Sequence, residues 1–466
     1  MDLTNKHILV VGLGKSGVSA ARFLVERGCL VTVTDNRTED ELCDVLPEIR
    51  KMGVAVELGH HSVDMFEEAD LIVLSPGVPH TIEPVRRARE KNIPVIGEIE
   101  LAYHFIDIPI IAITGTNGKS TTTLLLGEML AQSGFTALLG GNLGTPMIAY
   151  ANKHDTADFM VAEISSFQLD TIEKFKPKVS ILLNIADDHL DRYPDFDAYA
   201  QSKARIFKNQ DAGDICILND EDMVVRSISK NLTARRFVFN CSQSIESRAR
   251  VPGESRARVP GENRAWVTGQ TIWFHTKDAG VCEIDCSEIF LRGHHNLENA
   301  SAAGLAVLAL GGTISGIEGA LKQFKGLPHR VEYIDTIDGV KYYDDSKATN
   351  VDAVLRALES FFSPVVLIMG GRDKGGSYES LRSQVGQKVK QLILLGEAAE
   401  KIKKTIGDLV PTEMVSTMSM AVNMADKSTV HGDAVLLSPA CSSFDMYESY
   451  AQRGNDFKQA VYQLKG

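Results

Sequence analysis

The stretch Ala112–Thr123, AITGTNGKSTTT, has the residues of a phosphate-binding loop at an unusual spacing. A Walker loop reads G-x-x-x-x-G-K-[ST], with four residues between its glycines. The glycine that precedes Gly118 is Gly115, so this loop is the shorter G-T-N-G-K-S. The apolar run IIAIT comes before it, and KSTTTLLLGEML after it is typical of a helix entered through Ser and Thr. The sequence therefore predicts a strand, a tight loop and a helix, with loop N–H groups aimed at phosphate oxygens.

Four side chains suit Mg–ATP at this loop. We expect Lys119 to neutralise the charge of the β- and γ-phosphates and the Ser120 hydroxyl to suit Mg²⁺. Glu163 ends the apolar run in FMVAEIS, and His189 follows the run in VSILLNI. A lone Glu or His is more simply explained as a structural residue. Because the carboxyl ends of parallel strands meet at one edge of a sheet, however, we expect both beside the loop as Mg²⁺ ligands.

A second glycine loop lies near the N-terminus. VVGLGKSG contains G-x-G-x-x-G at Gly12, Gly14 and Gly17, and Asp35 ends the next apolar run. By itself, this pattern predicts an NAD-binding site, and the simpler interpretation is a tightly packed glycine turn. A full dinucleotide domain needs a second mononucleotide half, but the other phosphate loop begins too soon for one. A different nucleoside diphosphate would use the same geometry, and SPGVP at Ser75–Pro79 would lie on the same rim.

Apolar runs alternate with helical stretches in three successive segments of the 466-residue chain. The first contains LVTVT and DLIVLS, the second begins at IPIIAITGTNGKS, and the third contains VKYYDDS, PVVLIMGG, QLILLG and DAVLLSPA. This alternation predicts α/β domains with mostly parallel sheets. We expect a Rossmann-like N-terminal domain over 1–96, a central P-loop-type ATPase domain over 97–326 and a Rossmann-like C-terminal domain over 327–466.

Composition limits the class of protein. The net charge of -12 argues against general binding to nucleic acid or to anionic membrane. No run approaches the roughly 18 apolar residues of a membrane span, and the N-terminus lacks the pattern of a signal peptide. Seven scattered cysteines indicate reduced thiols, and Cys282 and Cys286 have no further ligand pattern to complete a zinc site. We therefore expect a cytoplasmic protein without membrane insertion.

One internal repeat interrupts the second segment. ESRARVPG at 246–253 recurs at 254–261, and a degenerate copy, ENRAWVTG, follows at 262–269. Pro-Gly marks a turn in both intact copies. Units of eight residues are too short for a solenoid. We expect a duplicated, mobile surface loop over 246–269, and the alternative is an Arg-rich contact site for an anionic partner.

Taken together, the motifs of this chain resemble those of the Mur ligase family. They are GTNGKST at 115–121, LRGHHNLENASAA, GLPHRVE, YYDDSKATN, GGRDKGG and LLSPACSSFD. The resemblance covers the chain except the octapeptide insert, and the compact first domain and PACSSFD are similar to the branch that adds D-glutamate. It implies a monomeric ligase of peptidoglycan precursor synthesis. Such a ligase joins D-glutamate to UDP-N-acetylmuramoyl-L-alanine through an acyl phosphate and releases ADP and phosphate.

The resemblance also implies which residues bind each substrate. The UDP-substrate, in place of NAD, would be bound by Gly14, Lys15, Ser16, Asp35, Asn36, Arg37, Ser75, Gly77 and Asn142. ATP would be bound by Gly115, Thr116, Asn117, Gly118, Lys119, Ser120, Thr121, Asn299, Arg330 and Asp345. D-glutamate would be bound by Lys347, Thr349, Lys374, Ser443, Phe444 and Tyr450. Tyr450 stands where the family usually has Phe, and the role of Arg372 in GGRDKGG stays open.

Lys203, in YAQSKARIF, has two interpretations. The plain one is a lysine on an amphipathic helix, either solvated or facing a phosphate. The resemblance implies instead a carbamylated lysine that supports two Mg²⁺ ions together with Ser120, Glu163 and His189. A carbamate presents the hard oxygen ligands that Mg²⁺ prefers, whereas an ammonium would repel the metal. Lys119, Glu163, His189 and Lys203 are thus the implied catalytic residues.

Three other functions remain open at this point. A sister ligase, or a folate polyglutamylating enzyme, would differ only in the final domain. An NAD-dependent dehydrogenase would use GLGKSG, but the second phosphate loop and the lack of an evident hydride site count against it. A non-catalytic nucleotide sensor would leave an intact Lys119 and Glu163 without an evident purpose.

Overall fold

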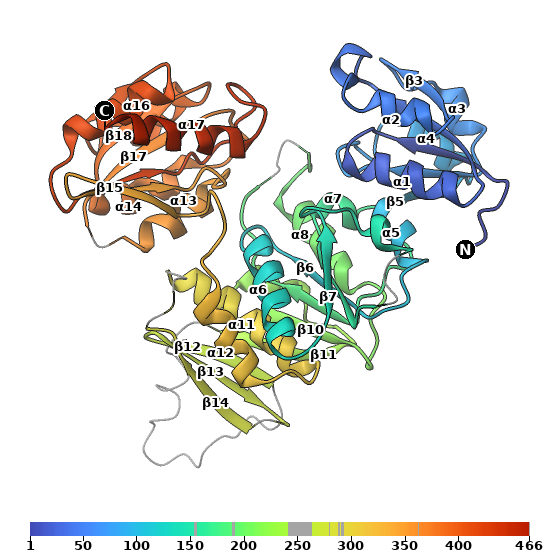
Figure 1. The fold of residues 1–466 in the computed structure, drawn as a ribbon, viewed down its shortest axis with the longest axis horizontal. Helices are drawn as coiled ribbons and strands as arrows, with labels where there is room; N and C mark the ends of the chain where they lie inside the picture. The colour runs from blue at the N-terminus through green and yellow to red at the C-terminus, as the bar shows by residue number, and fades with distance from the viewer. Residues whose placement is uncertain are drawn as a thin grey trace. The chain divides into compact units, whose positions relative to one another are not determined.

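The computed structural model describes residues 1–152, 156–188, 192–240, 263–278, 280–287, 289, 293–361 and 363–465. Its strands form three sheets that follow one another along the chain, each with helices packed on it (Figure 1). This confirms the predicted α/β class with three domains. The first two sheets belong to one compact unit and the third to another. Within the residues described, no helix has the length and apolar character needed to cross a bilayer.

The first sheet is parallel, with strand order β3-β2-β1-β4-β5. Its strands are β1 (His7–Val11), β2 (Leu30–Asp35), β3 (Ala55–Leu58), β4 (Leu71–Leu74) and β5 (Val95–Gly97). Its helices are α1 (Lys15–Glu26), η1 (Asp40–Leu42), α2 (Leu46–Lys51), α3 (Val63–Glu67), α4 (Glu83–Glu90) and α5 (Glu98–Tyr103). Strand order reverses between β1 and β4, and ligands of such sheets bind outside the strand ends at this point. Both the first glycine loop and SPGVP follow these two strands.

The second sheet has strand order β14-β13-β12-β11-β10-β9-β6-β8-β7 and is parallel from β7 to β12. Its strands are β6 (Ile110–Thr114), β7 (Ala137–Gly141), β8 (Phe159–Glu163), β9 (Val179–Leu182), β10 (Ile215–Asn219), β11 (Arg235–Asn240), β12 (Asn263–Thr268), β13 (Thr271–Thr276) and β14 (Gly280–Asp285). Its helices are α6 (Lys119–Gln132), η2 (Met147–Tyr150), α7 (Ser166–Leu169), α8 (Phe196–Ala204), η3 (Arg205–Phe207), α9 (Met223–Ile228), α11 (His294–Ala309) and α12 (Ile314–Gln323). The phosphate loop thus follows β6, a central strand flanked by β8 and β9.

The interpretation of residues 263–268 as part of a loop is wrong. Asn263–Thr268 is strand β12, paired with β11 and β13. Ala265 and Val267 alternate into the core, and Trp266 stacks on Trp273 across the strand pair. Alternating burial stabilises a strand at these positions. The two intact copies of the repeat lie outside the described residues, because the structure leaves out 241–262.

The third sheet has strand order β15-β16-β20-β17-β18-β19 and is parallel except for β15 with β16. Its strands are β15 (Glu332–Ile337), β16 (Val340–Asp344), β17 (Val365–Gly370), β18 (Val389–Leu395), β19 (Thr412–Met414) and β20 (Ala434–Leu437). Its helices are α13 (Val351–Glu359), η4 (Tyr378–Leu381), α14 (Arg382–Lys388), α15 (Ala399–Ile406), α16 (Met418–Ser428) and α17 (Tyr450–Gln463). Leu367 and Met369 of β17 pack into one apolar layer, and Val366 and Ile368 into the opposite one. Both faces are therefore covered, and the strand ends are left to carry polar loops.

Candidate active site

The tight loop forms a phosphate cradle at the start of α6. Gly118 is the N-cap residue with a φ of +87°, a left-handed conformation that favours glycine. A Cβ at Gly118 would also overlap the Asn299 amide, so the side chain of Asn299 lies directly against the loop. The Lys119 ammonium donates to the carbonyls of Gly115 at 2.8 Å and Thr116 at 2.9 Å. These contacts hold the cation at the loop and the helix N-terminus, where a phosphate is favoured.

Asn184, which the sequence analysis did not single out, fixes the shape of this loop. Its side-chain oxygen accepts from the N–H of Asn117 at 2.8 Å, and its amide donates to the Asn117 carbonyl at 3.1 Å. Its own carbonyl accepts from the N–H of Thr116 at 2.9 Å. Asn184 comes shortly after β9, and this position at a strand end is the one sequence feature that could have indicated a place near the phosphate loop.

Glu163 ends β8 beside the loop, as the sequence predicted. It is opposite Ile113 in the pairing of β8 with β6, and its side chain is buried. One carboxylate oxygen accepts from the Asn142 amide at 2.7 Å, and the other has no partner among the described residues. The Thr121 hydroxyl, on the first turn of α6, is likewise buried without a partner there. Unpaired buried oxygens are costly, and a hard cation such as Mg²⁺ would satisfy them.

Lys203 lies beneath the phosphate loop. It is on α8 and only 2% exposed, so the solvated interpretation is wrong. Its ammonium donates to the Gly115 carbonyl at 2.9 Å and lies 4.6 Å from the centre of the Tyr199 ring. The Tyr199 hydroxyl in turn lies 3.1 Å from the Thr116 hydroxyl. His189, the remaining metal-ligand candidate, lies outside the described residues.

The first glycine loop opens onto a cavity of about 400 Å³. The structure brings all nine residues expected at the UDP-substrate into its wall: Gly14, Lys15, Ser16, Asp35, Asn36, Arg37, Ser75, Gly77 and Asn142. His61 and Gln168 also line it and were not anticipated. A Cβ on Gly17 would overlap the Gly12 carbonyl, which accounts for the third glycine of the motif. The volume is in the range of cavities that hold small ligands.

Asp35 is committed to contacts within the protein. Its carboxylate accepts from the Leu13 N–H at 2.6 Å and from three donors of Arg37 at 2.8–3.1 Å. Burial alone would raise the pKa of Asp35, but the hydrogen bonds from Arg37 and Leu13 hold it below its ordinary value. An acid that binds the ribose of NAD needs free acceptor capacity. The arrangement favours instead a role in shaping the loop and orienting Arg37.

In the last domain, the loops after β16 and β17 meet at Lys374. Its ammonium lies 3.5 Å from an oxygen of Asp188 and 3.4 Å from the Thr349 hydroxyl. Asn350 donates to the other oxygen of Asp188 at 3.2 Å. Asp188, Asn350 and Lys374 line one small pocket together with Tyr378. The sequence analysis missed Asp188 and Asn350, although they neighbour His189 and Thr349 in the chain.

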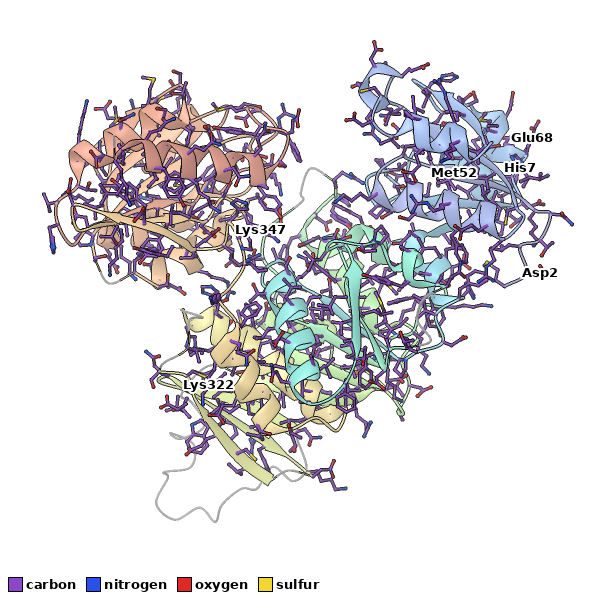
Figure 2. All side chains as sticks on the ribbon, in the orientation of Figure 1. Asp2, His7, Met52, Glu68, Lys322 and Lys347 are labelled. Atoms are coloured by element: carbon purple, nitrogen blue, oxygen red, sulfur yellow. The ribbon has the colours of Figure 1, made fainter. Side chains whose placement is uncertain are left out.

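The other residues expected at D-glutamate lie on the loops that follow β16 and β20 and at the first residue of α17. Lys347, labelled in Figure 2, follows β16, and its ammonium lies 5.3 Å from the centre of the Tyr450 ring. Ser443 and Phe444 follow β20, where Ser443 is buried and Phe444 is 63% exposed. None of these four residues lines the pocket that contains Lys374.

Arg330 and Asp345 are neighbours within the last domain. Asp345 is buried, and it accepts from the Ser438 hydroxyl at 2.7 Å and the Val331 N–H at 3.2 Å. Burial raises the pKa of Asp345 to about 7, against the opposing effects of Ser438 and Arg330. The Arg330 Nε is buried and has no partner among the described residues.

A compact group of possible metal ligands, His329, Glu332 and Asp344, lies beside these two residues. Its carboxylates already have a cation beside them, because the Lys458 ammonium lies 2.9 Å from Glu332 and 4.0 Å from Asp344. His329 Nδ1 lies 2.6 Å from Asp344. The group is therefore explained by an ion-pair network without a metal.

Three family models match successive parts of the chain. They are the Mur ligase MurD-like N-terminal domain over residues 6–97, the Mur ligase middle domain over 113–307 and the Mur ligase glutamate ligase domain over 329–441. The UDP-N-acetylmuramoylalanine--D-glutamate ligase of Desulfosudis oleivorans is 48% identical over all of this chain and 98% of that protein. This chain belongs to the Mur ligase family. The ligase of the same name from Desulfatibacillum aliphaticivorans is 47% identical, with both chains fully covered.

Solved structures of other Mur ligases share the fold. A pseudomurein peptide ligase type C from Methanothermus fervidus gives a TM-score of 0.61 at 20% identity, over 99% of this chain and 100% of that one. MurF from Thermotoga maritima, solved in complex with ADP, gives 0.61 at 14% identity, over 99% and 96% of the two chains. At these identities the likeness supports the three-domain Mur ligase architecture alone.

Proposed function

We propose that this protein is an ATP-dependent ligase that joins D-glutamate to UDP-N-acetylmuramoyl-L-alanine, with Mg²⁺, in peptidoglycan precursor synthesis. Two close relatives over the full length carry the name of this ligase. The last domain matches the glutamate ligase model of the family. Three domains bounded near residues 96 and 326, a monomeric state and a cytoplasmic location belong to the same proposal.

One observation carries the proposal. Asn142 lines the cavity of the first domain and also donates to Glu163, which lies beside the phosphate loop of the second. A substrate held by its UDP at Arg37 could therefore extend its other end toward the site where a phosphoryl group is transferred. A dinucleotide-binding protein or a simple nucleotide sensor has no need of such a connection.

The chemistry follows from the low reactivity of a carboxylate toward an amine. Transfer of the γ-phosphoryl group of ATP to the alanine carboxylate gives an acyl phosphate and ADP. The D-glutamate amine attacks the acyl carbon, and the tetrahedral intermediate expels phosphate as the amine loses a proton. Phosphoryl transfer needs positioning and charge neutralisation above all, which Lys119 and the loop N–H groups supply. This mechanism requires no covalent enzyme intermediate.

We further propose that Ser120, Glu163, His189 and a carbamylated Lys203 support two Mg²⁺ ions. The unpaired oxygens of Glu163 and Thr121 fit a hard cation at this edge of the sheet. When bound, Mg²⁺ would neutralise phosphate charge. Lys203 is buried and lies at the Gly115 carbonyl of the loop, and this position supports the proposal of a carbamate that contributes further oxygens.

The decisive test is phosphate release from ATP in the presence of UDP-N-acetylmuramoyl-L-alanine and one amino acid at a time. We expect D-glutamate to stimulate release, with L-glutamate, L-alanine and L-lysine at background. Detection of the amide product by mass spectrometry would distinguish ligation from ATP hydrolysis without amide formation. Better use of L-lysine or L-alanine than of D-glutamate would instead support a sister ligase.

Replacing Lys374 by alanine should raise the KM for D-glutamate by about tenfold to a hundredfold, with the KM for ATP little changed. Lys374 lies at a polar pocket in the last domain, and a charge-assisted hydrogen bond is worth roughly 1.5–3 kcal/mol. Steady-state kinetics with each substrate varied in turn measures this. Lys401→Ala is the matched control, because it removes a more exposed lysine that pairs with Asp373. An unchanged KM for D-glutamate in Lys374→Ala would remove this residue from the site.

A further inference from the structure

Arg453 is a buried cation whose guanidinium is bonded mainly to backbone carbonyls. It lies on α17, and only 2% of its surface is exposed. Among the described residues, no Asp or Glu side chain forms an ion pair with its guanidinium. Burial lowers the pKa of Arg453 to about 10, so the side chain stays charged at neutral pH. Arginine is seldom so fully buried unless it is paired, so the position requires an explanation.

The guanidinium directs its donors to three different loops. Nε donates to the Ser346 hydroxyl at 3.0 Å, and Nη2 donates to the carbonyls of Ser346 at 2.9 Å and Cys441 at 3.1 Å. Nη1 lies 3.4 Å from the Gly370 carbonyl and 3.3 Å from that of Ser442. These five contacts match the five N–H groups of a guanidinium. The Arg453 guanidinium therefore connects the chain segments at the ends of β16, β17 and β20.

Each of these loops carries residues assigned to D-glutamate. Ser346 directly precedes Lys347, and Ser442 directly precedes Ser443. Gly370 is the last residue of β17, and the loop that follows it leads to Lys374. A backbone pair between Arg372 and Ser442, with hydrogen bonds of 2.9 and 3.1 Å, links two of the loops a second time. Displacement of the guanidinium would thus remove the one group that contacts all three loops, while the pair between Arg372 and Ser442 would still link two of them.

We propose that Arg453 is the positioning residue of the D-glutamate pocket: it holds the loops that follow β16, β17 and β20 at a fixed spacing. The inference rests on the proposed function. Lysine cannot fully replace Arg453, because its compact ammonium has only three donors and lacks the planar arrangement of N–H groups of a guanidinium.

The test compares Arg453→Gln, Arg453→Lys and wild type in the full-length enzyme, with each of the three substrates varied in turn. We expect the KM for D-glutamate to rise about thirtyfold in Arg453→Gln and about tenfold in Arg453→Lys. The KM values for ATP and for UDP-N-acetylmuramoyl-L-alanine should stay within about threefold. Lys465→Met is the control, because it removes an exposed cation just beyond the same helix, paired with Asp335.

A milder variant keeps the test valid if loss of the arginine prevents folding. Ser346→Ala removes only the Nε contact and the bond from its hydroxyl to the Tyr450 carbonyl. We expect a rise of about threefold or more in the KM for D-glutamate alone. The inference would be overturned if Arg453→Lys had the wild-type KM for D-glutamate, or if the KM values for all three substrates rose equally. An unchanged KM for D-glutamate in these variants would overturn it as well. If wild type itself makes no product with D-glutamate, the proposed function fails instead.

Discussion

Replacing Lys119 by alanine should lower turnover about a hundredfold or more, because phosphoryl transfer then loses its fixed cation. The ammonium is held by two carbonyls of the tight loop at the start of α6. Removing one preorganised charge from such a site costs ~3 kcal/mol or more, which is about two orders of magnitude in rate. Binding of the UDP-substrate should be preserved, because its cavity is lined by none of the loop residues.

Single-turnover product formation and calorimetric binding of the UDP-substrate measure the two effects separately. Lys176→Ala is the matched control, since this lysine of the central domain forms a surface pair with Asp211 and Asp214. Thermal unfolding checks that loss of the two loop contacts leaves the domain folded. A purified Lys119→Ala enzyme with a near-normal rate would contradict the assignment of the loop.

Lys203→Ala and Lys203→Arg should both be severely impaired, again by about a hundredfold or more. Arginine keeps a cation that could still donate to the Gly115 carbonyl, but it cannot form the proposed carbamate. Carbamylation requires a neutral amine, and a buried lysine loses its proton more readily than an exposed one. Acetate or formate should partly restore Lys203→Ala by filling the vacated space with a carboxylate.

Dependence on dissolved CO₂ distinguishes a carbamate from a simple hydrogen-bond donor. Wild type purified and assayed without bicarbonate should lose activity and regain it on addition. Carbon-13 bicarbonate should give a carbamate resonance in wild type that is missing in Lys203→Arg. Full activity in Lys203→Arg would show that a cation suffices, and the carbamate would be abandoned.

The sequence predicted the elements that depend on strong local patterns. The run IIAIT became β6 and KSTTTLLLGEML became α6, because a buried central strand and a helix N-terminus each have a distinct signature. Strand ends predicted where Glu163 would lie. The strand at 263–268 was not predicted, because these residues were interpreted as a third copy of the Pro-Gly repeat. The alternation of buried and less buried side chains along them was therefore not considered.

Contacts between distant segments could not be read from the chain. The position of Asn184 after a strand indicates the edge of the sheet, but not that its side chain would brace a loop 67 residues away. The five hydrogen bonds of Arg453 depend on the packing of α17 against three strand ends, which no local pattern records. The pairing of Lys374 with Asp188 likewise spans 186 residues.

The division of the chain into three sheets has a consequence for how new specificities arise. The residues assigned to the amino acid follow β16, β17 and β20 of a single sheet, whereas those assigned to phosphoryl transfer gather around β6 and β8 of another. Mutations that exchange one amino acid for another can therefore accumulate in the loops after β17 and β20, apart from the phosphate loop after β6 and from Asp345 after β16. Descendants of one ancestral ligase could add different residues to a growing peptide while inheriting the same activation chemistry. Within the last domain, such changes would be tolerated most readily where they leave the Arg453 acceptors in place.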